Sequence, residues 1–112
     1  MQGVYLRFYV HEGQRHAGKL MYEWLLETAK KSGIPGGSAF RAMAGYGRHG
    51  VLHEQHFFEL AGELPVEVEF LLPEAQAESL LAVLRREGVN LFYAKSAAEF
   101  GVIEAQPGVS RP

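Results

Sequence analysis

The chain has 112 residues, of which 47% are hydrophobic and 21% charged, so it fits one globular domain and leaves no room for a second. Its formal net charge of −2 and its pI near 6.2 argue against DNA or RNA as the main partner, because scattered lysines and arginines are balanced by acids. The absence of cysteine excludes disulfides and thiolate metal sites, and the apolar runs are far shorter than the roughly 20 residues that cross a bilayer.

The first half of the chain predicts a strand followed by a helix. Polarity alternates over Val4–Val10, as in a half-buried strand whose even-numbered apolar residues face the core. Because this segment stands where a secretory signal would need a basic region and an apolar core, we expect a cytoplasmic protein. A helix is predicted from about Gly18 to Ser32, with lysines in its last turn and an end at Gly33 before Pro35.

The second half predicts three strands and another helix. The strands cover about Ser38–Ala44, Pro65–Leu72 and Asn90–Ala94, and the alternation is clearest in Pro65–Leu72. The helix starts at Pro73 and ends before Gly88, and the arginines in its last turn complement the helix dipole.

This order of elements, βαββαβ, predicts an α+β fold. We expect a ferredoxin-like sandwich in which an antiparallel four-stranded sheet, in the order 4-1-3-2, carries both helices on one face. Residues 1–106 are expected to form the domain, and residues 107–112 a short C-terminal tail.

The helix-free face of this sheet is expected to mix charges with aromatic side chains. The predicted strand order places Glu67 and Glu69 near Arg7 and Arg41, where ion pairs across strands can form. The same face is expected to hold Tyr5, Tyr9, Met43 and Leu71. We infer that other subunits cover this face in an oligomer, since an extended patch of this kind is costly to leave bare. The alternative is an ordinary solvated face.

The segment Gly45-Tyr46-Gly47-Arg48-His49-Gly50 is the clearest binding signal in the chain. It follows a predicted strand and opens a polar loop that runs to about His56. Glycines on both sides of Tyr46 free the backbone for positive φ, so its N–H groups can line a small nest for an anion, and Arg48 adds further donors.

A second anion candidate lies between the first strand and the first helix. Gly13–Lys19 matches the spacing G-x-x-x-x-G-K, but Leu20 replaces the Ser or Thr that holds Mg²⁺, and the fold is not the frame of P-loop enzymes. An anion-attracting helix entry and a purely structural turn both remain open. We expect this loop at the opposite end of the sheet from Gly45–Gly47, so that Arg15, His16 and Lys19 would join that site only across a subunit boundary.

Three histidines give a rival hypothesis. His49, His53 and His56 fall within eight residues, at spacings that suit Zn²⁺, Cu²⁺ or Ni²⁺ if the loop makes a helical turn. A solvated or hydrogen-bonding loop is the alternative. No pattern fixes a nucleophile, an orienting carboxylate and an oxyanion donor together, so we do not expect an enzyme.

Several segments taken together resemble the P-II signal-transduction proteins. These are Gly45-Tyr46-Gly47-Arg48, Pro65–Phe70 and the helix that begins with Pro73. Two further segments, His11–Glu23 and Phe40–Gly47, are similar to the P-II-like domain-of-unknown-function 190 family of bacteria and archaea. The resemblance covers about residues 4 to 104.

The resemblance implies a ferredoxin-like subunit, a homotrimer and ligand sites in the clefts between subunits. In P-II proteins the Gly-aromatic-Gly-Arg segment contributes to an adenine-nucleotide site at the base of a long loop. Carried over to this sequence, the segment implies that Gly45, Gly47 and Arg48 belong to the nucleotide site. His49 stands where a glutamine is usual. The P-II phosphate-holding turn is reduced here to Glu87–Asn90, and Ala98–Glu104 lacks the C-terminal arginines, so our hypothesis is a smaller phosphate load than ATP, such as AMP or a cyclic nucleotide, or another anion.

The sequence therefore predicts a P-II-like regulatory protein that binds a small anionic ligand and signals to a protein target through a loop from Gly45 to about Leu60, which changes order on binding. The ligand-binding residues are predicted to be Gly45, Tyr46, Gly47, Arg48, His49, Arg15, His16 and Lys19. The alternative is a metal-binding trimer that uses His49, His53 and His56. Two cofactor classes thus stay open, an adenine nucleotide and a divalent metal.

Overall fold

The computed structural model describes residues 1–46, 53–54 and 64–108 of the chain. Its two helices are α1 (Met21–Lys31) and α3 (Glu74–Arg86). The main strands are β1 (Gln2–His11), β4 (Ser38–Arg41), β7 (Pro65–Leu72) and β8 (Phe92–Glu99), and the two-residue strands are β2 (Arg15–His16), β3 (Lys19–Leu20), β5 (Ala44–Gly45) and β6 (His53–Glu54). Among the described residues, neither helix is long and apolar enough to span a membrane.

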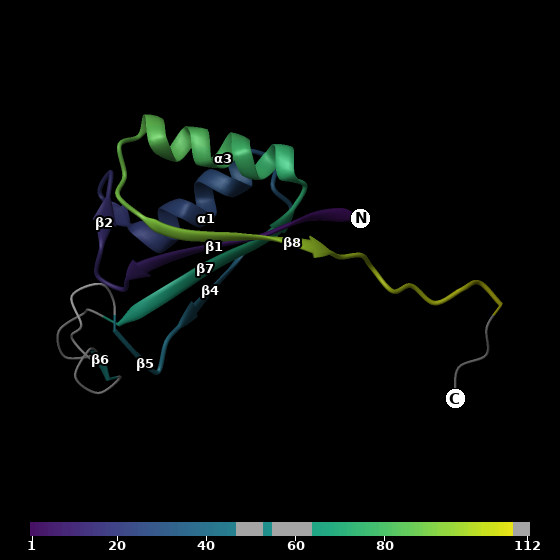
Figure 1. The fold of residues 1–112 in the computed structure, drawn as a ribbon, viewed down its shortest axis with the longest axis horizontal. Coiled ribbons are helices and arrows are strands. Elements are labelled where there is room, and N and C mark those ends of the chain that lie inside the picture. Colours follow the sequence, from purple (N-terminus) through teal and green to yellow (C-terminus); the bar gives the residue numbers. More distant parts are fainter. Residues whose placement is uncertain (47–52, 55–63, 109–112) are drawn as a thin grey trace.

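The four main strands form one antiparallel sheet in the order β4-β7-β1-β8. Both helices cover the same face of this sheet, as Figure 1 shows. In the order of the strands along the chain this is 4-1-3-2 read from the β8 edge, so the predicted ferredoxin-like sandwich is confirmed.

The core lies between the helices and the two central strands. Antiparallel register pairs Val4 with Leu72 and Val10 with Val66, so the apolar rows of β1 and β7 face the helices together. The helices contribute buried side chains to the same cluster, namely Met21, Leu25 and Ala29 from α1, and Ala77, Leu80, Leu81 and Leu84 from α3. Since burying one large apolar side chain stabilises the fold by about 1.5–3 kcal/mol, this cluster is the main source of stability.

The first helix begins later than the sequence predicts. We expected it from about Gly18, but α1 starts at Met21, because Lys19–Leu20 pairs instead with Arg15–His16 in a short hairpin. The turn of this hairpin has positive φ at Ala17 (51°) and Gly18 (79°), a geometry that matches the twist of paired strands and not a helix.

Two strand boundaries also differ from the prediction. The strand expected over Ser38–Ala44 ends at Arg41, where its last contacts with β7 are the pair of Arg41 with Val66 and the bond from the Ala42 N–H to the Pro65 carbonyl. The last strand, expected over Asn90–Ala94, runs over Phe92–Glu99. Its second half has weak β-propensity, and pairing with β1 decides its length.

The helix-free face carries part of the charge pattern that we expected. The Nε of Arg7 lies 3.8 Å from the Oε1 of Glu67, and the Tyr5 hydroxyl donates to Glu69. The placement of Arg41 was wrong: it lies opposite Val66 in the register, and its guanidinium pairs with Glu12.

The two predicted anion loops lie at the same end of the sheet, which corrects the expectation that they lie at opposite ends. Both β1 and β4 pair antiparallel with β7, so they run in the same direction and finish together. The contact between Arg41 and Glu12 joins the two strand ends. In Figure 1 the β2 hairpin and the β5–β6 pair therefore lie at the same end of the sheet.

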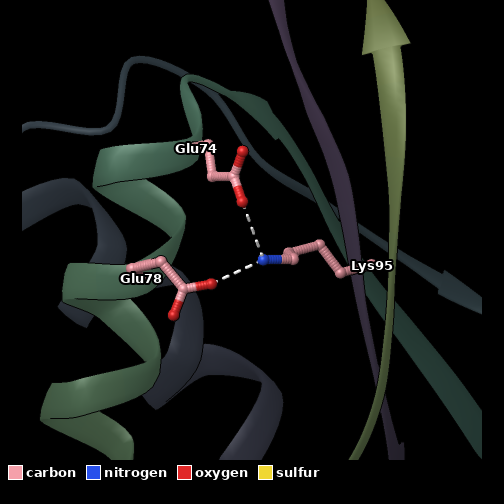
Figure 2. Close-up of polar contacts among 3 residues, drawn as sticks. All are labelled: Glu74, Glu78 and Lys95. Atoms are coloured by element: carbon pink, nitrogen blue, oxygen red, sulfur yellow. Dashed lines mark hydrogen bonds and ion pairs between the residues drawn. The ribbon is translucent and has the colours of Figure 1, made fainter.

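Two ion pairs of one lysine connect the edge strand β8 to α3. The Nζ of Lys95 lies 2.5 Å from the Oε1 of Glu78 and 3.3 Å from the Oε1 of Glu74, and Figure 2 shows the lysine reaching from the strand to both carboxylates on the helix. The hydrogen bond from Lys95 lowers the pKa of Glu78 below its ordinary value of 4.5, and the bonds to the glutamates raise the pKa of Lys95.

The lowered pKa of Glu78 predicts a pH-dependent stability. A carboxylate with a depressed folded-state pKa stabilises the fold above its ordinary pKa, and this contribution disappears as the pH falls through the folded-state pKa. The melting temperature of the native chain should therefore fall more steeply below pH 4.5 than that of Glu78→Gln. Circular dichroism melts across this range test the prediction, with Glu23→Gln on α1 as control; equal slopes for all three proteins would contradict it.

Candidate functional site

The predicted glycine loop is only partly described by the structure. Gly45 lies in β5 and pairs with His53 of β6, and the next residue, Tyr46, is 74% exposed. Gly47, Arg48, His49 and His56 lie outside the described residues. Their nomination as ligand or metal residues stays a prediction, as does that of His53; the described residues contain no group of three or more His, Cys, Asp or Glu that could hold a metal ion.

The basic residues of the first loop all have contacts within the chain. The guanidinium of Arg15 donates to the Gly18 carbonyl oxygen at 2.9 Å, which closes the β2–β3 turn. Lys19 forms an ion pair with Glu27 of α1. The first contact stabilises the hairpin and the second connects it to α1, so both cations have a structural role.

His16 joins the hairpin to the far end of α3. Its ring packs edge-on against Trp24 with centroids 4.3 Å apart, and its Nε2 lies 3.5 Å from the Oε2 of Glu87. That nitrogen is buried and makes no hydrogen bond with any described residue. Glu87 is the C-cap residue of α3, so His16 helps to position the hairpin against the helix end.

A hollow of about 560 Å³ lies at the other end of the sheet, where β1 and β4 begin. Its walls are mainly apolar, and its polar groups come from the helix-free face. The lining residues are Tyr5, Pro35, Gly36, Gly37, Ser38, Glu69, Phe70, Leu71 and Phe100. A mostly apolar hollow with a few converging polar groups is the usual form of a small-molecule site.

The segment between α1 and β4 shapes this hollow. Gly33, at φ 85°, ends the helix, and Ile34 then turns into the core. Gly37 passes so close to β7 that a Cβ there would lie 2.4 Å from the Cε1 of Phe70. Only glycine allows this approach, which lets the chain enter β4 beside the hollow.

Phe100 forms the opposite wall and is held by the first residues of the chain. The N-terminal amine donates to the Phe100 carbonyl at 2.9 Å, and the Phe100 N–H donates to the Met1 carbonyl at 3.0 Å. Gly3 makes room for the ring, since a Cβ at that position would lie 2.6 Å from its Cε1. The wall is thus built from the first residues of the chain and from Phe100, which directly follows β8.

The polar side chains that line the hollow are those of Tyr5, Ser38 and Glu69. The hydrogen bond from Tyr5 to Glu69 raises the pKa of Tyr5 to about 12, so the phenol stays neutral at physiological pH. The guanidinium of Arg7 stacks on the Tyr5 ring, 4.9 Å from its centroid. An anion would be repelled by Glu69, so this hollow suits a flat, uncharged ring or a hydroxyl-bearing group that donates hydrogen bonds.

A second hollow of about 300 Å³ lies on the helix side of the same segment. It is lined by Leu26, Ala29 and Lys30 of α1 together with Ile34, Pro35, Gly36, Gly37 and Phe70. The two hollows share Pro35–Gly37 and Phe70, so they adjoin each other at the segment that leads into β4.

Sequence reasoning missed the hollow, although parts of it were visible. It placed Tyr5, Glu69 and Leu71 on the helix-free face, but as an interface between subunits. The signal for the rest is the run Pro35-Gly36-Gly37-Ser38 after a helix stop. Phe100 could not be assigned from sequence, because its place depends on the pairing of β8 with β1.

Comparisons with known proteins agree with this fold. The model of the DUF190 family, described as "Uncharacterized ACR", matches residues 3–89. A UPF0166 protein of Aquifex aeolicus (strain VF5) is 36% identical over 80 residues, which cover 71% of this chain and 76% of the relative. A UPF0166 protein of Methanocaldococcus jannaschii is 38% identical over 64 residues, which cover 57% of this chain and 58% of the relative.

Two solved structures show the same fold. CPII, a nitrogen regulatory PII-like protein from Thiomonas intermedia K12 solved with ADP, AMP and bicarbonate, superposes with a TM-score of 0.68 at 15% identity over 91% of each chain. A putative PII-like signaling protein from Thermus thermophilus superposes with a TM-score of 0.60 at 16% identity over 88% of each chain. At these identities the likeness establishes the fold alone.

The shape of the hollow predicts different effects for two neighbouring glycines. Gly37→Ala places a methyl group against Phe70 and should destabilise the protein by about 1–3 kcal/mol, as overpacking does. Gly36→Ala is the matched control, because a Cβ there meets no heavy atom within 4 Å. Denaturant unfolding of both variants tests this, and equal stability of the two would show that the chain does not approach Phe70 closely at Gly37.

Proposed function

The chain belongs to the DUF190 family, whose model matches more than half of it, and from this premise we propose that it is a P-II-like regulatory protein that binds an adenine nucleotide or another small anionic ligand. The ligands named for CPII, which are ADP, AMP and bicarbonate, guide this choice. A cytoplasmic location and a protein target that reads the bound state are part of the same proposal, and catalysis is not.

The observation that carries the proposal is the hollow beside Tyr5 and Glu69. Its volume of about 560 Å³ fits a small ligand, and its apolar walls suit the faces of a purine ring. The Glu69 carboxylate accepts hydrogen bonds and so suits an exocyclic amino group or ribose hydroxyls, which an inorganic anion lacks. We therefore assign the base and sugar of a nucleotide to this hollow.

The phosphate of the nucleotide would be bound by a second copy of the chain, at the end of the sheet that carries the glycine loop. Within one copy the length of β4 separates Ser38, in the hollow, from Gly45 at the start of the glycine loop. One nucleotide would therefore reach both only where the hollow of one copy meets the loop of the next. This supports ligand sites in the clefts between subunits of a homotrimer.

The cations for the phosphate are those that the sequence nominates. Arg48, with the backbone of Gly45 and Gly47, is the first candidate, because guanidinium forks and free N–H groups bind phosphate oxygens. Lys19 would have to exchange its ion pair with Glu27 for the phosphate, which costs part of the binding energy. Because few cations are available to bind phosphate, we expect the site to prefer AMP or a cyclic nucleotide over ATP, which carries more negative charge.

A thermal-shift titration against AMP, ADP, ATP, cyclic AMP and bicarbonate tests the proposed function. A ligand at a hundredfold excess over Kd should stabilise the native state by about 2.7 kcal/mol and raise the melting temperature. We expect AMP or a cyclic nucleotide to give the largest saturable shift. The absence of a shift with every compound would overturn the nucleotide assignment.

Two variants locate the site, each with a matched control. Ser38→Leu fills the hollow and should abolish the shift, whereas Ser79→Leu, at an exposed position of α3, should not. Arg48→Ala should weaken nucleotide binding about 10- to 100-fold, the usual effect of losing a charged hydrogen-bond donor, whereas Arg85→Ala should leave it unchanged. Binding that is insensitive to Arg48→Ala would remove Arg48 from the site.

A further inference from the structure

The second hollow has no role in the proposed function. It lies between the last turns of α1 and the segment that leads into β4. Its volume of about 300 Å³ stands at the lower end of the range of small-molecule sites, and most of its lining is apolar. A hollow of this size suits a short organic molecule.

The apolar lining of the second hollow belongs to the hydrophobic core. Ala29, Ile34 and Phe70 are buried core residues, and Leu26 packs against them. The chain at Gly37 passes between two of these side chains, because a Cβ there would lie 2.4 Å from the Cε1 of Phe70 and 3.1 Å from the Cδ2 of Leu26. Core packing therefore sets the shape of the hollow before a ligand binds.

The charged side chain of the second hollow is a lysine without an ionic partner. Lys30, in the last turn of α1, is exposed and makes no ion pair with any described residue. Glu27, one turn earlier on the same helix, pairs with Lys19 instead. The ammonium group of Lys30 is thus available for an anion at the edge of an apolar hollow.

The main chain around the second hollow also favours an anion. Gly36 and Gly37 line it, and their N–H groups donate to no described residue. The end of α1 does not present its carbonyls in the same way, since the Ala29 carbonyl accepts hydrogen bonds from the Ser32 and Ile34 N–H groups. Free N–H groups bind carboxylate oxygens well.

We propose that the second hollow binds a small apolar monocarboxylate. The hydrocarbon part of such a ligand lies against Leu26, Ile34 and Phe70, and its carboxylate pairs with Lys30. Bicarbonate lacks the hydrocarbon part, and an uncharged alcohol lacks the carboxylate. This site goes beyond the proposed function, because the binding of the carboxylate does not require a nucleotide.

The position of the second hollow gives the carboxylate an effect on the first. Pro35–Gly37 and Phe70 line both hollows, so a ligand in one changes a wall of the other. The carboxylate is therefore an effector of nucleotide binding, and this effect rests on the proposed function. Coupling between two sites is reciprocal, so each ligand changes the affinity of the other by the same factor.

An NMR titration tests the site, with isovalerate as the probe. Saturable shifts of the backbone amide signals of Gly36 and Gly37 are expected with isovalerate. Isoamyl alcohol, which keeps the hydrocarbon part, and acetate, which keeps the charge, should bind more weakly. The proposal is overturned if these two amide signals do not respond, or if the alcohol binds as tightly as the carboxylate.

Two lysine variants test the ionic contact. Lys30→Gln should weaken isovalerate binding about 5-fold, the upper end for an exposed ion pair. Lys31→Gln is the matched control, because Lys31 is the next exposed lysine of α1 and does not line the hollow. Native affinity in Lys30→Gln would remove Lys30 from the site.

The coupling is measured as the Kd of AMP with and without saturating isovalerate. We expect a change of about 5-fold or more, and an equal change in the Kd of isovalerate when AMP is present. Unchanged Kd values would overturn the coupling. Isovalerate binding without any AMP binding would overturn the nucleotide assignment and support the second site, whereas AMP binding without isovalerate binding would do the reverse.

Discussion

The antiparallel pairing of β1 with β7 is the constraint on which the rest of the structure depends. It aligns two apolar rows on one face, which both helices cover, and it turns Tyr5, Arg7 and Glu69 to the other face. A slip of the register by one residue would exchange these faces and expose the core. The register therefore decides at once where the helices pack and where the polar groups of the hollow lie.

The same pairing decides which loops lie at the same end of the sheet. Because β1 and β4 both oppose β7, the hairpin after β1 and the glycine segment after β4 lie at one end of the sheet, and the hollow lies at the other. A single subunit thus separates its carboxylate-containing hollow from the described cations of the first loop, Arg15 and Lys19, by the length of a strand. This separation is why the proposed nucleotide site is placed between two copies.

Local contacts then assign most of the exposed charges to structural roles. Lys95 joins β8 to α3, Arg41 joins β4 to Glu12, which directly follows β1, and Lys19 joins the hairpin to α1. Each pair is exposed and contributes modestly to stability, yet together they tie the peripheral elements to the central strands. An anion that recruits Lys19 must compete with such a contact.

The sequence by itself determined the family resemblance, the order of elements and the boundaries of Pro65–Leu72, because short motifs and alternating polarity are local properties. It also predicted the residues of β1 and β7 on the helix-free face, whereas Arg41 was misplaced and Met43 lies beyond the end of β4. Only the tertiary structure decided the β2–β3 hairpin, the common end of the two loops, the length of β8 and the hollow closed by Phe100. These features depend on which strands pair and in which direction, and such contacts between residues far apart in the chain leave no periodicity in the sequence.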